Sequence, residues 1–185
     1  DHIDNTILII TRKETMTEKN NLRSNLLKHN ILNDKLSDEI GTKLRQLVSD
    51  RVVCTYIPLD SEINILPALS NTSEMNTTFM LDDELQICFY GAPFIKQQNG
   101  ILEPENKIIR NNTEVFIVPG VAFTKFGSRL GRGGGHYDAL LKKYPNALKI
   151  GICHDFQLIK DIPLEEHDIP MDYVLTNINY YKSST

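Results

Sequence analysis

The sequence lacks any apolar run long enough to span a bilayer, and its short apolar stretch near the amino terminus follows acidic residues, unlike a secretory signal. It also lacks an excess of positive charge. The formal net charge is −4, which argues against a nucleic-acid surface. The three cysteines, Cys54, Cys88 and Cys153, are scattered and show no CxxC spacing. We therefore expect reduced, buried thiols in a cytoplasmic protein that binds neither nucleic acid nor membrane.

The length of 185 residues is near that of one domain and suffices for a hydrophobic core. Residues 1–16 are interpreted as an N-terminal extension, native or added, because Met16 would make a natural start. Residues 17–185 then form the domain, in which helical and strand patterns alternate. The expected fold class is α/β: a single-domain layered fold with a central, mostly parallel sheet and helices on both sides.

The spacing of apolar residues predicts the individual elements. Helices are expected at about 17–28, with Thr17 as the cap, 34–49 and 135–144. Strands are expected at about 52–57, 77–81, 84–90, 114–120, 147–153 and 172–177. The stretch 91–107 is interrupted by Gly, Pro and Asn and is expected to be a long loop. The strand at 114–120 is almost wholly apolar, which is typical of a parallel sheet buried on both faces, and ligands of such sheets sit at the carboxyl ends of the strands.

The most informative stretch follows that strand and reads RLGRGGGHYD, residues 129–138. Four glycines lie within five positions, just before an expected helix. Backbone N–H groups at a helix start can bind an anion, and glycines let the anion come close. Arg129 and Arg132 add planar donors that suit phosphate or carboxylate. The pattern favours a phosphate-binding loop over the alternative, a flexible connection with solvated arginines.

Two common phosphate-binding patterns do not fit this loop. The Walker pattern requires Gly-Lys-Ser/Thr, but Gly135 is followed by His136. The dinucleotide pattern requires glycine where His136 stands. The loop alone therefore predicts a phosphate ligand and leaves the reaction open.

The loop and the preceding VPGVAF (residues 118–123) closely resemble the signature of the 5-formyltetrahydrofolate cyclo-ligase (methenyltetrahydrofolate synthetase) family. Four further segments resemble family motifs in the same order: KNNLR (19–23), YIPLDSEIN (56–64), NGILEP (99–104) and EEHDIPMDYVLT (165–176). The resemblance covers about residues 17–177. A five-part match in order is far more specific than any one motif.

The resemblance implies an ATP- and Mg²⁺-dependent conversion of 5-formyltetrahydrofolate to 5,10-methenyltetrahydrofolate, with release of ADP and phosphate. ATP phosphorylates the formyl oxygen, which makes a poor leaving group a good one, and the neighbouring nitrogen attacks the activated carbon. The implied ligands are thus ATP, Mg²⁺ and a folate, and the implied protein is a monomeric enzyme of one-carbon metabolism. Positioning and charge stabilisation should carry its catalysis.

The resemblance also implies roles for individual residues. The residues that would bind the nucleotide are Lys19, Arg23, Arg129, Leu130, Gly131, Arg132, Gly133, Gly134, Gly135, His136 and Tyr137. Folate binding falls to Ile57, Glu62, Arg132, Gly133, Gly134, Gly135 and His136. Catalytic roles fall to Arg132 and Tyr137, and magnesium binding falls to Asp138 and Asp172. The spacing of Lys19 and Arg23 places both on one helix face, and Glu62 could accept hydrogen bonds from pterin N–H groups.

Three positions depart from the family pattern. His136 stands where tyrosine is usual, and Thr124 stands where aspartate is common. Some relatives have lysine at the position of Gly134, so the loop arginines and the metal must supply the positive charge here. Neither His154 nor His167 has metal-ligand spacing, and both are expected to be structural.

Two rival functions stay open beside the cyclo-ligase reaction. One is a paralogue that holds nucleotide or folate without turnover, although the chain retains the cations and acids of the implied site. The other is a different small ATP-dependent ligase on the same scaffold. Formation of methenyl-folate that depends on ATP would separate the three.

Overall fold

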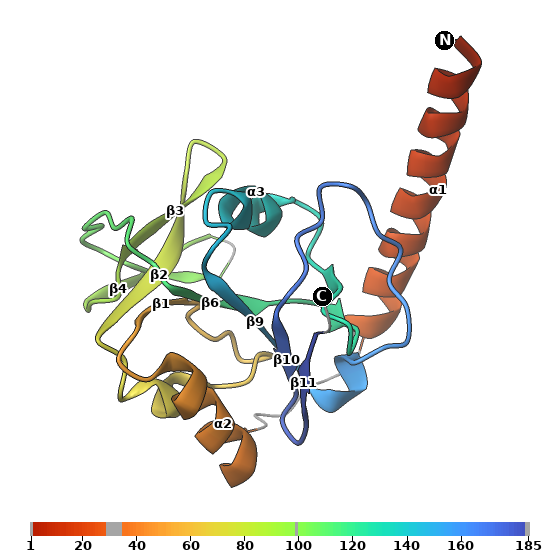
Figure 1. Ribbon diagram of the computed structural model, residues 1–185. Helices are drawn as coiled ribbons and strands as arrows, with labels where there is room; N and C mark the ends of the chain where they lie inside the picture. The colour runs from red at the N-terminus through yellow and green to blue at the C-terminus, as the bar shows by residue number, and fades with distance from the viewer. Residues whose placement is uncertain (1, 29–34, 99, 184–185) are drawn as a thin grey trace.

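The computed structural model describes residues 2–28, 35–98 and 100–183, and its centre is a seven-stranded sheet (Figure 1). The strands of this sheet are β1 (Val52–Thr55), β2 (Glu74–Leu81), β3 (Glu84–Phe89), β6 (Val115–Pro119), β9 (Leu148–Ile152), β10 (Tyr173–Leu175) and β11 (Tyr180–Lys182). Their order is β11-β10-β9-β6-β1-β2-β3. The pairs from β10 through β2 are parallel, and the two edge pairs are antiparallel. The predicted α/β fold with a mostly parallel sheet is confirmed.

Helices cover both faces of the sheet, as predicted (Figure 1). The helices α2 (Asp38–Val48) and η1 (Leu66–Leu69) pack on one face, and α3 (His136–Lys142) packs on the other. Successive side chains of a strand point to opposite faces. Val53 of β1 therefore enters the core under α2, whereas the next residue, Cys54, enters the core under α3. The three cysteines are free and buried, as expected.

Helix α2 illustrates how the sequence sets these contacts. The Ser37 hydroxyl accepts a hydrogen bond from the backbone N–H of Ile40 at 3.4 Å and so caps the helix start. Ile40, Leu44 and Val48 recur at helical spacing and are fully buried against the sheet. Each such side chain contributes about 1.5–3 kcal/mol through removal of apolar surface from water. The predicted start of this helix, at residue 34, lies outside the described residues.

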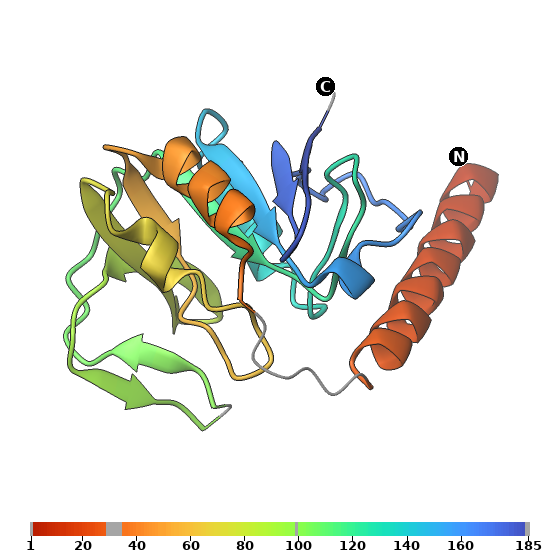
Figure 2. The ribbon, with the colours of Figure 1, turned by 90° about the horizontal axis from the view of Figure 1, so that it is seen from below.

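Helix α1 (His2–Leu26) differs from the prediction, because it runs through Thr17 without a break. The Thr17 hydroxyl donates to the carbonyl of Lys13 at 2.9 Å, so it lies within a continuous helix and does not cap one. The amino-terminal half of α1 points away from the sheet (Figures 1 and 2). At the other end, Leu22 and Leu26 pack on a small apolar cluster. Although α1 is long, no helix among the described residues is apolar enough over a sufficient length to cross a membrane.

The segment 91–107 was expected to be a loop, and the structure corrects this. It contains a small hairpin of β4 (Phe94–Lys96) and β5 (Leu102–Pro104), which lies beside the main sheet (Figure 2). Both strands are short and end near Pro or Gly, so their period-2 pattern is too brief to read from the sequence. The hairpin matters for the site because Leu102 and Glu103 line its cleft.

A second hairpin carries the start of the glycine loop. It consists of β7 (Ala122–Phe123) and β8 (Arg129–Leu130). The Thr124 hydroxyl accepts hydrogen bonds from the backbone N–H groups of Phe126 and Ser128, at 3.3 and 3.2 Å, and thus closes the turn between the strands. A carboxylate could accept the same two bonds, so this threonine can play the part in the turn that an aspartate would play. A short helix, η2 (Asp155–Gln157), follows β9.

Candidate active site

A cleft of about 800 Å³ lies where β1 and β6 end, between α1 and the β4–β5 hairpin. This is the carboxyl edge of the parallel strands, the place where ligands of such sheets bind. The cleft gathers nearly all of the sequence-predicted site residues: Lys19, Arg23, Ile57, Glu62, Arg129, Leu130, Gly131, Arg132, Gly133, Gly134, Gly135, His136, Tyr137 and Asp138. Asp172 is the exception among the predicted residues.

The glycine loop forms the floor of this cleft and leads directly into α3. Gly133 and Gly135 have φ angles of +107° and +65°, in the region that favours glycine. Gly135 precedes the first residue of α3, so the loop ends in a left-handed turn at the helix start. The side chain of Arg132 is exposed, and its Nη2 lies 3.8 Å from Oε1 of Glu62. The loop therefore presents bare backbone and one exposed cation to a ligand.

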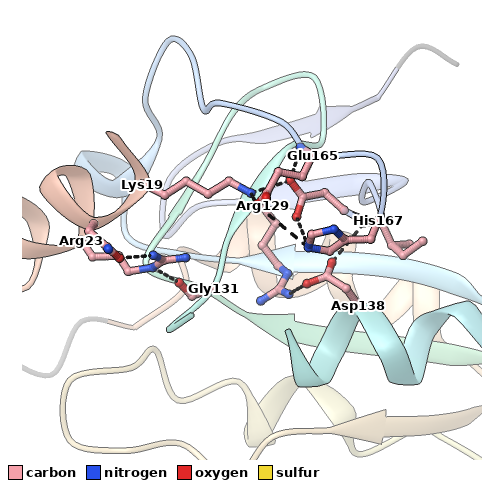
Figure 3. Close-up of polar contacts among 10 residues, drawn as sticks. Lys19, Arg23, Arg129, Gly131, Asp138, Glu165 and His167 are labelled. Carbon is pink, nitrogen blue, oxygen red and sulfur yellow. Dashed lines mark hydrogen bonds and ion pairs between the residues drawn. The ribbon is translucent and has the colours of Figure 1, made fainter. Parts of the chain in front are cut away.

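Arg129 is the buried cation of the loop, and its partner is Asp138. Nη2 of Arg129 lies 2.9 Å from Oδ2 of Asp138, and the two side chains are 5% and 13% exposed (Figure 3). The other oxygen of Asp138 accepts a hydrogen bond from the backbone N–H of Ile169 at 3.0 Å. The guanidinium also lies 5.5 Å from the ring centre of Tyr137. These contacts tie the loop, α3 and the segment before β10 into one rigid unit.

Helix α1 contributes the two remaining cations, Lys19 and Arg23, to the opposite wall (Figure 3). Nε of Arg23 donates to the carbonyl of Gly131 at 2.8 Å, and Nη1 donates to Oδ1 of Asn20 at 2.7 Å. Arg23 thereby joins α1 to the glycine loop. Lys19 is buried and points toward residues 165–168. The predicted pairing of the two cations on one face of a helix is confirmed.

Ile57 and Glu62 follow the end of β1 and line the cleft. Oε2 of Glu62 accepts a hydrogen bond from the backbone N–H of Leu59 at 3.0 Å. Burial raises the pKa of Glu62, while the Leu59 N–H and Arg132 act in the opposite direction. Burial likewise raises the pKa of Tyr137, which favours the protonated phenol, a hydrogen-bond donor.

The structure does not bring Asp172 to Asp138. Asp172 immediately precedes β10 and therefore lies at the amino edge of the parallel sheet, opposite the cleft. Its Oδ2 accepts a hydrogen bond from the backbone N–H of Lys149 at 2.7 Å and lies 3.9 Å from the Lys149 ammonium. It lines a separate surface pocket there. The predicted metal pair is therefore not assembled, and Asp172 serves as a cap where β9 and β10 begin.

Sequence reasoning missed a different acidic group in the cleft, Glu165 and Asp168. Both carboxylates lie 2.7 Å from the ammonium of Lys19. His167, expected to be structural, is exposed and lies within 4.8 Å of both as a possible third metal ligand. The resemblance covers this segment but implies a metal-binding role for Asp172, the carboxylate next to the strand. The better signal was position: residues before a strand-entry loop can reach the cleft, whereas the residue at the strand start cannot.

The glycine loop and its arginines lie at the carboxyl edge of a parallel sheet, and Glu165 and Asp168 line the same cleft. This arrangement is typical of an α/β enzyme with an anion-binding cleft. A sequence model described as the 5-formyltetrahydrofolate cyclo-ligase family matches residues 11–177. The chain belongs to this family.

Individual relatives agree with the family match. A 5-formyltetrahydrofolate cyclo-ligase of Mycoplasma genitalium is 30% identical over 178 residues, which cover 88% of this chain and 99% of that protein. One from Mycolicibacterium smegmatis is 30% identical over 70% of this chain and 75% of that protein. The solved structure of Aquifex aeolicus 5,10-methenyltetrahydrofolate synthetase has a TM-score of 0.68 and 28% identity, and the match covers 89% of this chain and 92% of that one.

Proposed function

We propose that this protein converts 5-formyltetrahydrofolate to 5,10-methenyltetrahydrofolate and consumes ATP with the aid of Mg²⁺. The observation that carries the proposal is the single cleft. This cleft brings together the glycine loop, the cations of α1 and the partly buried carboxylate of Glu62, and this proximity supports a common ligand site. The three free, buried cysteines agree with a reducing compartment, and we assign the reaction to the cytosol.

The cleft divides naturally into a nucleotide part and a folate part. We assign the triphosphate to the glycine loop, between Arg129 on one side and Lys19 and Arg23 on the other. Nε of Arg129 is buried and has no hydrogen-bond partner among the described residues, so a phosphate oxygen could accept its proton. We assign the pterin to Ile57 and Glu62, where a carboxylate oxygen can accept from ring and amino N–H groups.

The proposed reaction requires little covalent participation by the protein. The formyl oxygen attacks the γ-phosphorus of ATP, the bond to ADP breaks, and a formyl phosphate ester forms. The neighbouring folate nitrogen then attacks the formyl carbon and gives up its proton, and the phosphate leaves with the former formyl oxygen and that proton. The exposed guanidinium of Arg132 would stabilise charge on the transferred phosphoryl group, and Tyr137 can donate its phenol proton in a hydrogen bond.

The residues of the cleft fit a magnesium ion bound together with ATP. Four cationic and five carboxylate side chains line the cleft among the described residues, so ATP alone would meet no excess of positive charge. Asp138 and Asp168 offer the oxygen ligands that Mg²⁺ prefers, and Ile169 joins their segments through its bond to Asp138. These two would hold the ion beside phosphate oxygens. When bound, Mg²⁺ would neutralise charge on the phosphates.

A direct assay tests the proposal. The purified chain is incubated with 5-formyltetrahydrofolate, ATP and Mg²⁺, and the absorbance of the methenyl product and the release of phosphate are followed together. Equal amounts of the two products are expected, and no methenyl product should form without ATP. Ligand binding without turnover would favour the binding paralogue. ATP cleavage with a different acid in place of the folate would favour another ligase.

We predict that Lys19→Ala and Arg23→Ala each raise the Michaelis constant for ATP by about tenfold or more. Each removes a charge-assisted contact to phosphate, typically worth about 1.5–3 kcal/mol. Initial rates at varied ATP and varied folate measure both constants. Lys13→Ala is the matched control, because Lys13 is an exposed cation of the same helix outside the cleft. A rise confined to the folate constant would remove the nucleotide assignment.

We predict that Glu62→Gln weakens folate binding by about tenfold or more and leaves ATP binding unchanged, because glutamine supplies no charge to the pterin donors. Burial raises the pKa of Glu62, so wild-type folate affinity should fall as the pH is lowered through that raised pKa, whereas the variant should show a flatter profile. Titration with folate at several pH values measures both effects. Asp60→Asn, an exposed neighbour, is the control. Parallel pH profiles for the wild type and Glu62→Gln would contradict the assignment.

A further inference from the structure

Residues 165–168 form a closed turn that presents two carboxylates side by side. The backbone N–H of Asp168 donates to the carbonyl of Glu165 at 3.0 Å. In return, the backbone N–H of Glu165 donates to Oδ2 of Asp168 at 2.8 Å. The turn is thus held by two reciprocal hydrogen bonds. Asp168 closes the turn through Oδ2, whereas the Glu165 side chain has no part in closing it.

The ammonium of Lys19 contacts both of these carboxylates, and Figure 3 shows it beside Glu165. Nζ donates to Oε2 of Glu165 and to Oδ2 of Asp168, both at 2.7 Å. The Lys19 side chain is 6% exposed, and those of Glu165 and Asp168 are 26% and 13% exposed. An ammonium has three N–H donors. Two are fixed by the turn, which leaves the third for a group inside the cleft that Lys19 lines.

A lysine side chain has four rotatable bonds and loses much conformational entropy when it is fixed. Lys19 loses this conformational entropy when the protein folds, before any nucleotide binds, because two short charged hydrogen bonds hold its ammonium. A binding group that is already ordered does not have to be ordered again when the ligand binds. Because Glu165 orders the Lys19 side chain, we expect Glu165 to increase the affinity of the cleft for an anion.

We propose that Glu165 is a positioning residue for the nucleotide: it holds the Lys19 ammonium so that its remaining N–H points at a phosphate oxygen of ATP. This inference rests on the proposed function, since it takes Lys19 to be a phosphate contact. Glu165 itself, as a carboxylate, does not touch the phosphate. Its effect on ATP affinity passes entirely through Lys19, and this distinguishes it from a residue that merely stabilises the turn.

A double-mutant cycle tests this dependence. ATP is titrated with Mg²⁺, without folate, into the full-length wild type, Glu165→Gln, Lys19→Met and the double variant. Glu165→Gln should weaken ATP binding about three- to tenfold, with kcat at saturating ATP within about twofold of the wild type and folate binding unchanged. In the Lys19→Met background, the same substitution should have no further effect. Glu166→Gln is the matched control, because Glu166 is adjacent, exposed and not among the cleft-lining residues.

The outcomes separate this inference from the function on which it rests. If Lys19→Met binds ATP normally, Lys19 is not a nucleotide contact, and the positioning role of Glu165 is refuted as well. If Lys19→Met is impaired but Glu165→Gln is not, the positioning role alone is refuted. Equal losses from Glu165→Gln in both backgrounds would assign Glu165 to the stability of the turn. Tighter ATP binding by Glu165→Gln would mean that Glu165 competes with phosphate for Lys19, and would also overturn the proposal.

Discussion

Gly134→Val should reduce kcat/KM for ATP by about 100-fold or more and leave the fold nearly unchanged. The atoms nearest to a Cβ at Gly134 would all belong to the imidazole of His136, which it would overlap. His136 is exposed, so its ring can move aside. The valine side chain would then occupy the space in which we place the phosphates, between them and the backbone donors of the loop. Steady-state kinetics and thermal unfolding of the same preparations measure the two parts of this prediction.

The neighbouring glycines provide graded controls for this result. Gly134→Ala should show a smaller loss than Gly134→Val, because its side chain is shorter. Gly133→Ala should behave differently and lower the stability of the loop, because its φ of +107° is strained for any side chain and its Cβ would approach Arg23. Normal turnover by folded Gly134→Val would refute the phosphate-binding role of the loop. A Gly134→Val variant that is largely unfolded at the temperature of the assay would also refute the prediction, because its loss of activity would then follow from loss of the fold.

Arg129→Met should destabilise the protein by about 3–5 kcal/mol, the usual effect of removing one partner of a buried ion pair. The substitution leaves the carboxylate of Asp138 without its guanidinium, at 13% exposure. Methionine retains much of the apolar stem, so lost packing accounts for little of the change. For a chain of this size the loss corresponds to a drop in Tm on the order of 10 °C. Denaturant unfolding at neutral pH measures it.

The double variant Arg129→Met/Asp138→Asn isolates the cause. Removing the second charge should recover much of the lost stability, because the cost lies in an unpaired buried carboxylate and not in the missing arginine. Neither variant should regain activity, since both lack a cation that we assign to phosphate. If the double variant were less stable than Arg129→Met alone, the ion pair would not be the source of the effect.

The main sheet could be predicted because its signal is local and repeated. Alternation in β1 sends Val53 and Cys54 to opposite cores, and the apolar run of β6 is buried on both faces. The β4–β5 hairpin could not be predicted in the same way. Its strands have three residues each, too few for a period to emerge, and their pairing depends on a fold that the segment does not itself specify.

The candidate site divides in the same way between local and distant information. The glycine loop is one continuous stretch, so its residues were found together and lie together. To predict the acidic residues of the cleft, one must choose between Asp168 and Asp172, which are close in sequence but lie at opposite edges of the sheet. That choice depends on where β10 begins, and strand boundaries are the least reliable part of any sequence reading. The role of Glu165 is further removed, because its partner Lys19 lies in another part of the chain.

The ion pair between Lys19 and Glu165 has a consequence for biosynthesis, because it joins residues 146 positions apart. Contacts of such long range form late, since the chain between them must first lose its freedom. On the ribosome, at about 5–20 residues per second, Lys19 emerges on the order of ten seconds before its partner. Near the end of that interval the nascent chain includes the residues of α1, β1 and the glycine loop, yet the contact between Lys19 and Glu165 cannot form. ATP should therefore stabilise the finished protein and offer little help to the growing one.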